Sequence, residues 1–313
     1  MSKPLSLSAI EVRRHDWDRF ICTLFAPEDR REDLFTLLAF NLELARTREM
    51  VTEPLIGEMR LQWWRDAIDG IYDGSRKDVT GHYVLKHLPG VIQSRNLSKA
   101  LFVELIETRL LDLSDQPPSD MAALQAYARG TSSALNLLQL EILGHGDGLA
   151  PEAEALGLAW AMTGLMRAVP TLGRQGRSPV PESLLPAGRD LTVMDEDLRH
   201  AVKTVCQAAE RHLKEASQSR ATDNPAVPSL FLLRPLCRSY LTKMARANYD
   251  ASAPALRQSR AKQQLLLWKK NLQNASKKKI LIRLATISYT YDGMHIAKEY
   301  NHITFGQTHG YVF

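Results

Sequence analysis

The sequence predicts an all-α protein. Apolar side chains recur with the 3.6-residue period of an α-helix from about residue 12 to residue 280. The strict alternation typical of a half-buried β-strand does not occur over these residues. Proline and glycine residues divide the periodic stretches into segments of helical length. With 313 residues, of which 44% are hydrophobic, the chain is long enough for one large helical domain.

The first three helical segments are predicted between residues 12 and 74. The first segment ends before Pro27, and the second opens at Glu28, where an acidic first turn suits the helix dipole. The third begins after Pro54 and ends at Gly74. The apolar residues that share one face of this third helix are Ile56, Met59, Trp63, Ala67 and Ile71.

Three helices are predicted between residues 99 and 169. Residues 99–113 are helical in pattern, and a proline-containing loop follows them. Ser119 is the expected N-cap of a long helix that ends at Gly144. Pro151 begins another helix, which is expected to run to about Val169. Residues 170–189 are rich in proline and glycine, so they are predicted to form a loop.

Three further helices complete the predicted domain, at residues 195–219, 229–248 and 253 to about 274. Residues 1–271 are therefore predicted to form one helical domain. Residues 272–313 differ, because a basic run gives way to polar and aromatic residues without a helical face. They are predicted to be an appended tail, whose structure the sequence does not indicate.

Composition and charge exclude several classes of protein. The net charge is +5, with a late lysine run at residues 269–279 that fits either a solvated tail or contact with anionic lipid. No interleaving of aromatic and basic residues accompanies it, so nucleic acid is not an expected partner. No uncharged apolar run reaches the roughly 20 residues of a membrane-spanning helix. The N-terminus lacks the pattern of a signal or transit peptide.

The nucleophilic and metal-binding residue types form no recognisable constellation. Cys22, Cys206 and Cys237 are widely spaced, which favours free thiols and a reducing, cytoplasmic location. The histidines are dispersed, without an HExxH pattern. Ser132 and Ser133 have no evident His or Asp partner, so hydrolase chemistry is excluded.

Five short segments follow one another in a fixed order along the chain: residues 39–46 (AFNLELAR), 57–64 (GEMRLQWW), 106–113 (IETRLLDL), 127–131 (YARGT) and 157–167 (GLAWAMTGLMR). Together they resemble the squalene/phytoene synthase family across roughly residues 10–270. Within that family the likeness is greatest to the branch that contains the mitochondrial complex I assembly factor of phytoene-synthase type and its bacterial relatives. The resemblance implies an isoprenoid synthase fold, a trans-prenyltransferase type of helical bundle with a central cavity.

The resemblance also implies a particular chemistry. Family enzymes join two prenyl diphosphates head to head, and departure of diphosphate requires Mg²⁺ held by oxygen ligands. Those ligands come from two facing helices, each with Asp at positions i and i+4, which lie on one helical face.

In the first of these motifs, Arg48 and Thr52 occupy the positions of the family's aspartates. Glu49 and Glu53 keep the four-residue interval, but a shift of one residue rotates them by about 100° around the helix. Two interpretations remain open: Glu49 and Glu53 bind metal on a rotated helix, or they form a solvated acidic face beside Pro54.

In the second motif, Ala168 and Leu172 stand where the family has acids, and Gly164 stands where it has Asn. Arg167 matches the family residue. Pro170 is expected to disrupt the helix, because it lacks a backbone donor. The resemblance therefore implies no resident cofactor, with Mg²⁺ at Glu49 and Glu53 only if the protein is an active enzyme.

Basic and aromatic residues in the matched segments are candidate ligand-binding residues. Guanidinium groups hold a diphosphate or lipid phosphate without metal. The alternative is that these arginines lie on helix surfaces or pair with nearby acids. Trp63, Trp64 and Trp160 are likewise candidates for a prenyl-sized pocket or for plain core. The candidate ligand-binding set is Arg46, Arg109, Tyr127, Arg129 and Arg167.

Two functional hypotheses follow. The first is a non-catalytic member of the fold, a pseudoenzyme that acts as an assembly or accessory factor for respiratory complex I or binds an isoprenoid at the inner membrane. Its expected partners are a complex I subunit or assembly intermediate, and a prenyl diphosphate or lipid ligand. Its expected location is cytoplasmic, with peripheral contact at the inner membrane. The alternative is an active head-to-head prenyltransferase that uses prenyl diphosphates and Mg²⁺.

Overall fold

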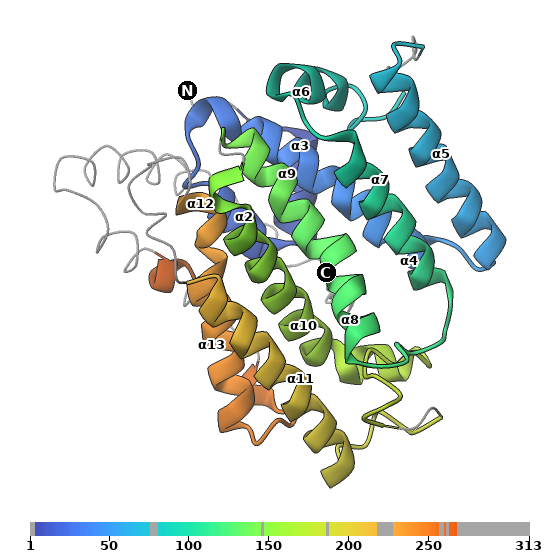
Figure 1. Cartoon of the computed structure of the whole chain (residues 1–313), viewed down its shortest axis with the longest axis vertical. Helices are drawn as coiled ribbons and strands as arrows, with labels where there is room; N and C mark the ends of the chain where they lie inside the picture. The colour runs from blue at the N-terminus through green and yellow to red at the C-terminus, as the bar shows by residue number, and fades with distance from the viewer. Residues whose placement is uncertain are drawn as a thin grey trace, which may run out of the picture.

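The computed structural model describes residues 4–75, 81–144, 147–185, 188–217, 228–256, 260 and 263–267. Within these ranges every regular element is helical and no strand occurs. The helices pack side by side, with α10 (Ala150–Arg174) in the middle of the bundle (Figure 1). The predicted all-α class is confirmed.

Two N-terminal helices replace the single segment predicted before Pro27. α1 (Leu7–His15) begins at Ser6, whose Oγ accepts a hydrogen bond from the Ala9 amide at 3.1 Å. α2 (Trp17–Thr23) begins at Asp16, whose Oδ1 accepts from the Arg19 amide at 3.1 Å. Asp16 therefore separates the two helices, because its side chain caps the N-terminus of α2. α3 (Glu28–Ala45) begins where the acidic turn predicted it.

The next two helices are α4 (Thr47–Met50) and α5 (Pro54–Tyr72). Pro54 lies in the first turn of α5, where its missing N–H costs no intrahelical hydrogen bond. The buried face of α5 contains Leu61, Trp64 and Ile68. Of the five apolar residues predicted on one face, Ala67 and Ile71 are buried, whereas Ile56, Met59 and Trp63 are exposed. The shared apolar face lies at the boundary of the core and only partly inside it.

Shorter elements replace the helices predicted over residues 99–113 and 119–144. After α6 (Leu88–Arg95), the segment predicted over residues 99–113 divides into α7 (Lys99–Thr108) and a 3-10 turn, η1 (Arg109–Leu113). The prediction of Ser119 as N-cap was wrong, because Asp120 accepts from the Ala123 amide at 2.8 Å. The elements that replace the predicted helix over 119–144 are α8 (Met121–Ala128), the π-turn η2 (Arg129–Ser133) and α9 (Ala134–Ile142).

The long helix α10 overturns one prediction. After the short turn η3 (Asp147–Leu149) it runs to Arg174, with Pro170 inside it, so the loop begins about five residues later than predicted. A proline inside a helix costs about 3 kcal/mol through its missing donor and ring clash. Most residues of α10 are buried between its neighbours, and their burial outweighs that cost.

Four elements complete the described chain: α11 (Glu196–Glu215), α12 (Pro228–Phe231), α13 (Leu233–Arg246) and η4 (Pro254–Leu256). The helix predicted from residue 195 begins there, and Asp195 is its N-cap, since its Oδ1 accepts from the Leu198 amide at 2.9 Å. The predicted helix over 229–248 divides at Leu232. Residues 263–267 are helical, but most of the helix predicted from 253 to 274 and the whole tail at 272–313 lie outside the described residues.

Close packing holds α10 against η2. An added Cβ on Gly157 would lie 2.4 Å from the Ser133 Cα atom, so only glycine permits this approach. Ser133 Oγ donates to the Glu154 carbonyl at 2.7 Å, and Asn136 Nδ2 donates to the Ala153 carbonyl at 3.1 Å. These contacts fix η2 and the first turn of α9 against α10.

A cavity between two motif segments

A cavity of about 320 Å³ lies where the end of α3, α4, η1, α8 and α10 meet. Two loops close its remaining sides, residues 114–119 after η1 and residues 177–179 after α10. The loops are tied together by two backbone hydrogen bonds, from the Glu182 amide to the Pro118 carbonyl at 2.9 Å and from the Ser183 amide to the Ser119 carbonyl at 3.0 Å. Its volume is at the lower end of the range for small-molecule sites.

A buried charged cluster forms one wall of the cavity. The Arg109 guanidinium is 2% exposed, and its Nη1 donates to Asp112 Oδ2 at 3.0 Å and to the Tyr127 hydroxyl at 2.9 Å. Tyr127 donates in turn to Asp112 Oδ1 at 2.8 Å. Arg177 Nη2 donates to the Asp112 carbonyl at 3.2 Å and lies 3.9 Å from its Oδ1. Burial raises the pKa of Tyr127, so the hydroxyl stays a donor to the carboxylate.

At the mouth of the cavity, a second ion pair joins α4 to the loop after η1. Arg48 Nη2 lies 3.3 Å from Asp115 Oδ1. Glu49, the next residue of α4, also lines the cavity and is exposed. Apolar walls come from Leu111, Leu165 and Leu172.

The structure brings together residues from both motif segments considered in the sequence. Arg48 and Glu49 of the first, Leu172 of the second, and Arg109 and Tyr127 line the same cavity. The remaining positions, Thr52, Glu53, Gly164, Arg167 and Ala168, do not contribute to its lining. Of the two glutamates considered as metal ligands, Glu49 borders the cavity and Glu53 does not. Trp64 and Trp160 are buried in the core, and Trp63 is exposed.

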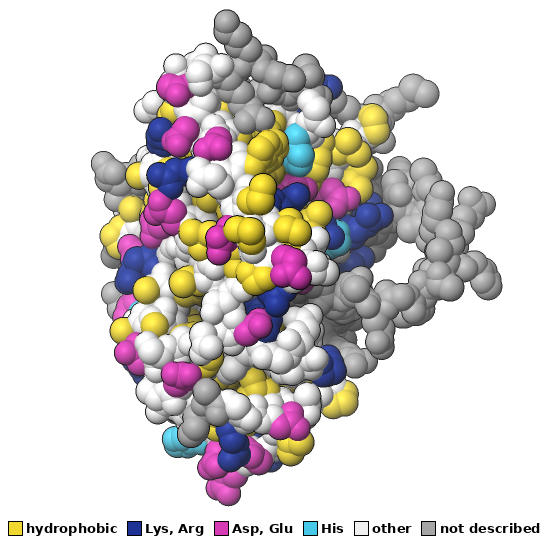
Figure 2. All heavy atoms as spheres, turned by 90° about the vertical axis from the view of Figure 1, so that its right-hand side faces the viewer, with side chains coloured by type: hydrophobic (Ala, Val, Ile, Leu, Met, Phe, Trp, Pro, Cys, Tyr) yellow, Lys and Arg dark blue, Asp and Glu magenta, His cyan; other side chains and the backbone are white. Residues whose placement is uncertain are grey.

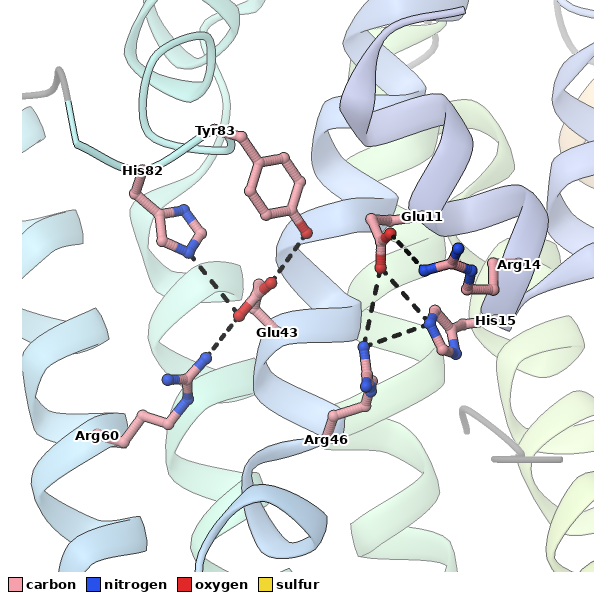
Figure 3. A network of polar contacts seen from close by, with 8 residues as sticks. All are labelled: Glu11, Arg14, His15, Glu43, Arg46, Arg60, His82 and Tyr83. Atoms are coloured by element: carbon pink, nitrogen blue, oxygen red, sulfur yellow. Dashed lines mark hydrogen bonds and ion pairs between the residues drawn. The ribbon is translucent and has the colours of Figure 1, made fainter. Parts of the chain in front are cut away.

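Arg46 lies beyond the cavity lining and belongs to a network between α1 and α3. Figure 3 shows its side chain directed toward Glu11 and His15. Its Nη1 lies 3.4 Å from His15 Nε2 and 3.9 Å from Glu11 Oε2. Partial burial and then the Arg46 charge lower the pKa of His15, so the imidazole favours its neutral form.

The same view contains a second cluster, centred on Glu43 of α3 (Figure 3). Arg60 Nη2 donates to Glu43 Oε2 at 2.5 Å and the Tyr83 hydroxyl to Oε1 at 2.9 Å, while His82 lies 3.8 Å away. Burial favours a raised pKa for Glu43, but the hydrogen bonds from His82 and Tyr83 and the Arg60 charge outweigh it and lower the pKa. This cluster ties α5 to α3.

Arg129 and Arg167 also have partners outside the cavity. Arg129 Nε pairs with Glu154 Oε1 at 2.7 Å on the surface. The Arg167 guanidinium lies 3.5 Å from the ring centroid of Tyr240, on the side of α10 away from Leu165 and Leu172. Ligand binding by Arg46, Arg129 and Arg167 stays a prediction, and the arrangement gives each of them another contact.

Asp18 of α2 lies in a cluster on that far side of α10. Its Oδ2 accepts from the Tyr240 hydroxyl at 2.7 Å and its Oδ1 from Gln263 Nε2 at 2.6 Å. Burial raises the pKa of Asp18 to about 6, although the Arg167 charge and the Tyr240 hydrogen bond favour the carboxylate.

This raised pKa predicts a pH dependence of stability. Between pH 4 and pH 6 the folded state binds more protons at Asp18 than the unfolded chain, so the contribution of Asp18 to the free energy of unfolding falls as pH rises. We expect the free energy of unfolding of Asp18→Asn, relative to that of the wild type, to rise by about 2 kcal/mol from pH 4 to pH 7. Urea unfolding at each pH measures this difference. The exposed Glu58→Gln is the control. A difference between Asp18→Asn and the wild type that stays constant across this range would contradict the prediction.

The carboxylates near the cavity fit Mg²⁺ poorly. Both Asp112 oxygens are hydrogen-bonded by Arg109 or Tyr127, and Asp115 is paired with Arg48. Within the described ranges, no group of three or more His, Cys, Asp and Glu side chains is placed to hold a metal ion. Mg²⁺ requires several oxygen ligands in octahedral geometry, and Glu49 alone does not supply them.

Three charged residues that line the cavity were not among the candidate site residues: Asp112, which lies in a matched segment, and the loop residues Asp115 and Arg177. Arg177 and Asp115 complete the ion pairs of the cavity, but each lies in a loop without periodicity. The only available signal was local: both loops contain adjacent Pro, Ser and charged residues between predicted helices.

The helices around this cavity define an all-α protein of the isoprenoid synthase fold. The solved structure of squalene synthase HpnC from Alicyclobacillus acidocaldarius superposes with a TM-score of 0.68 at 19% identity, covering 78% of this chain and 93% of that one. A dehydrosqualene synthase crystallised with a ligand gives a TM-score of 0.72 at 15% identity, covering 86% and 96%. At these identities the likeness establishes the fold alone.

The chain belongs to the squalene/phytoene synthase family, whose model matches residues 12–268. A relative from Bos taurus, named NADH dehydrogenase (ubiquinone) complex I, assembly factor 6, is 32% identical over 254 residues, covering 78% of this chain and 75% of the relative. The homologue of that factor in Drosophila melanogaster is 32% identical over 257 residues, covering 76% and 74%. Among the described helices, none combines the length and apolar character needed to cross a membrane.

Proposed function

We propose that this chain is a non-catalytic accessory or assembly factor of respiratory complex I. The observation that carries the proposal is the 32% identity, over about three quarters of both chains, to relatives named as complex I assembly factors. The expected partner is a complex I subunit or assembly intermediate. The expected location is cytoplasmic, with peripheral contact at the inner membrane.

The cavity supports the non-catalytic part of this proposal. Ionisation of a prenyl diphosphate requires metal charge near the leaving group, which is a major part of transition-state stabilisation. The resemblance implies that Arg48 and Leu172 occupy metal-ligand positions of the family, and both residues line the cavity. The nearby acids Asp112 and Asp115 are paired with arginines. The cavity instead suits binding of a single small ligand, with an isoprenoid or lipid phosphate as the proposed class.

One observation favours the alternative, an active prenyltransferase. Residues from both motif segments border one cavity, as the family's chemistry requires, and Glu49 is an exposed carboxylate at its mouth. This alternative needs Mg²⁺ bound by a changed set of ligands.

The assay that tests the proposal uses purified protein with farnesyl or geranylgeranyl diphosphate, Mg²⁺ and NADPH. We expect no hydrocarbon product and no diphosphate release, together with reduced complex I activity in a deletion strain. Turnover that disappears in Glu49→Gln/Glu53→Gln would establish the prenyltransferase instead. Normal complex I activity in the deletion strain would refute the assembly role.

A further inference from the structure

One face of α5 exposes a continuous row of large apolar side chains. Leu55 is 65% exposed, Ile56 50%, Met59 66% and Trp63 43%. Their spacing places all four within about a third of the helix circumference. We call this surface the α5 stripe. Figure 2, which faces α5, shows hydrophobic side chains gathered there with acidic and basic side chains beside them.

Such a row differs from the scattered apolar residues of an ordinary surface. Single exposed leucines are common in monomeric proteins and require no explanation. Four neighbouring large side chains on one helix are typical of a surface that binds a partner. The Trp63 ring contacts the rings of Trp64 and His82, with centroids 5.0 and 6.0 Å apart, so the stripe rests on a packed support.

The charges around the stripe indicate what it binds. Residues 47–72 contain three arginines and five acids. Each of the three arginines is paired: Arg48 with Asp115, Arg60 with Glu43, and Arg65 with Glu107 and Asp69. A paired arginine contributes little positive potential to the surface around it.

The acids nearest the stripe differ from these arginines in their ion pairing. Glu49, Glu53 and Glu58 are all exposed, and none has an ion-pair partner among the residues that the structure describes. Glu53 immediately precedes α5, and Glu58 lies beside the stripe on the same helix. Within the part of the chain that the structure describes, the apolar stripe is therefore bordered by carboxylates without an ion-pair partner.

We infer that the α5 stripe binds an amphipathic helical segment of a partner protein, with an apolar face bordered by lysines or arginines. Its apolar side chains would cover Leu55, Met59 and Trp63, and its cations would face Glu53 and Glu58. An anionic membrane fits less well, because its surface potential repels those carboxylates. A second copy of the chain fits less well for the same reason, since two stripes would bring like charges together.

This inference rests on the proposed function, because a partner-binding surface fits a factor that acts on another protein. It adds the location of the binding surface and the chemistry of that segment. The cavity lies on other residues, so the stripe variants described next leave the ion pairs of Arg109 and Arg48 intact.

Three labelled 18-residue helical peptides test the inference by fluorescence anisotropy against the full chain. The first carries a leucine face bordered by lysines, the second replaces the lysines with glutamates, and the third replaces the leucines with serines. We expect the first to bind at least tenfold more tightly than either of the others. Equal affinity for the glutamate peptide, or for the serine peptide, would overturn the inference.

Variants locate the binding surface. Leu55→Ser/Met59→Ser should weaken binding of the lysine peptide at least tenfold, whereas Glu53→Lys/Glu58→Lys should transfer the preference to the glutamate peptide. The matched control is Leu7→Ser, which changes a leucine of similar exposure, 64%, on α1. Loss of binding in that control equal to the loss in the stripe variant would overturn the inference. Binding of phosphatidylserine vesicles by the wild type would also overturn the inference if Leu55→Ser/Met59→Ser abolished that binding. Dimerisation of the wild type that the same variant abolished would overturn it as well.

Complementation separates this inference from the proposed function. In a deletion strain with low complex I activity, we expect the wild type and Leu7→Ser to restore activity and Leu55→Ser/Met59→Ser to fail, at equal protein levels. Full restoration by the stripe variant would refute the surface and leave the assembly role standing. A deletion strain with normal complex I activity would refute the assembly role, and the peptide measurements would still decide the surface.

Discussion

Gly157→Ala is expected to destabilise the protein by about 3 kcal/mol or more. The added Cβ would lie 2.4 Å from the Ser133 Cα and 2.5 Å from its amide nitrogen. These are backbone atoms of the π-turn η2, so no side-chain rotation relieves the contact. Either α10 and η2 separate or the turn changes shape, and both expose the buried residues between them. Urea unfolding followed by circular dichroism measures the effect.

Gly90→Ala provides the matched control. Gly90 also lies within a helix, α6, but an added Cβ there meets nothing within 4 Å. Alanine is favoured over glycine in a helix by about 0.5–1 kcal/mol, so this variant should be slightly more stable than the wild type. Equal changes in the free energy of unfolding for Gly157→Ala and Gly90→Ala would contradict the close approach of α10 to η2.

Arg109→Met has the second large expected effect, a loss of about 3–5 kcal/mol in the free energy of unfolding. Methionine fills much of the space but removes the charge that faces Asp112, whose side chain is only 14% exposed. Asp112 would keep Tyr127 as a donor and Arg177 at 3.9 Å, which compensate it only in part. The cost is that of a buried carboxylate left without its main partner.

A double-mutant cycle isolates this pair. Asp112→Asn removes the negative charge, so Arg109→Met/Asp112→Asn should be less destabilised than the sum of the two single variants by more than 1 kcal/mol. Tyr127→Phe removes two hydrogen bonds, one accepted from Arg109 and one donated to Asp112, and should cost about 2 kcal/mol. Additive single effects would mean that Arg109 and Asp112 do not interact as an ion pair.

The order of the helices was largely predictable because helix signals are local. Glu28 and Pro54 begin α3 and α5 as predicted, and Asp195 caps α11. The errors occur where a tertiary contact overrides a local signal. Pro170 was expected to end α10, but the helix continues because it is buried on several sides. Asp16 divides the first predicted segment because its side chain caps a new helix.

The candidate site was predictable in part. Arg109 and Tyr127 were predicted to bind a ligand, and both line the cavity. Arg46 and Arg167 were predicted with them, but their side chains point to His15 and Tyr240. A segment match gives the position of a residue along the chain but not the direction of its side chain. Successive side chains on a helix differ in direction by about 100°. Arg177 joined the cavity from a loop, where no periodicity indicates direction.

The sequence by itself determined that the chain is helical and which family it belongs to. These properties depend on residue types at short spacing, and those are readable along the chain. Only the tertiary structure decided that Asp112 and Asp115 are paired with arginines, and that Leu55, Met59 and Trp63 lie outside the core. Pairing and exposure depend on which faces of distant helices meet, and that is set by packing of the whole bundle.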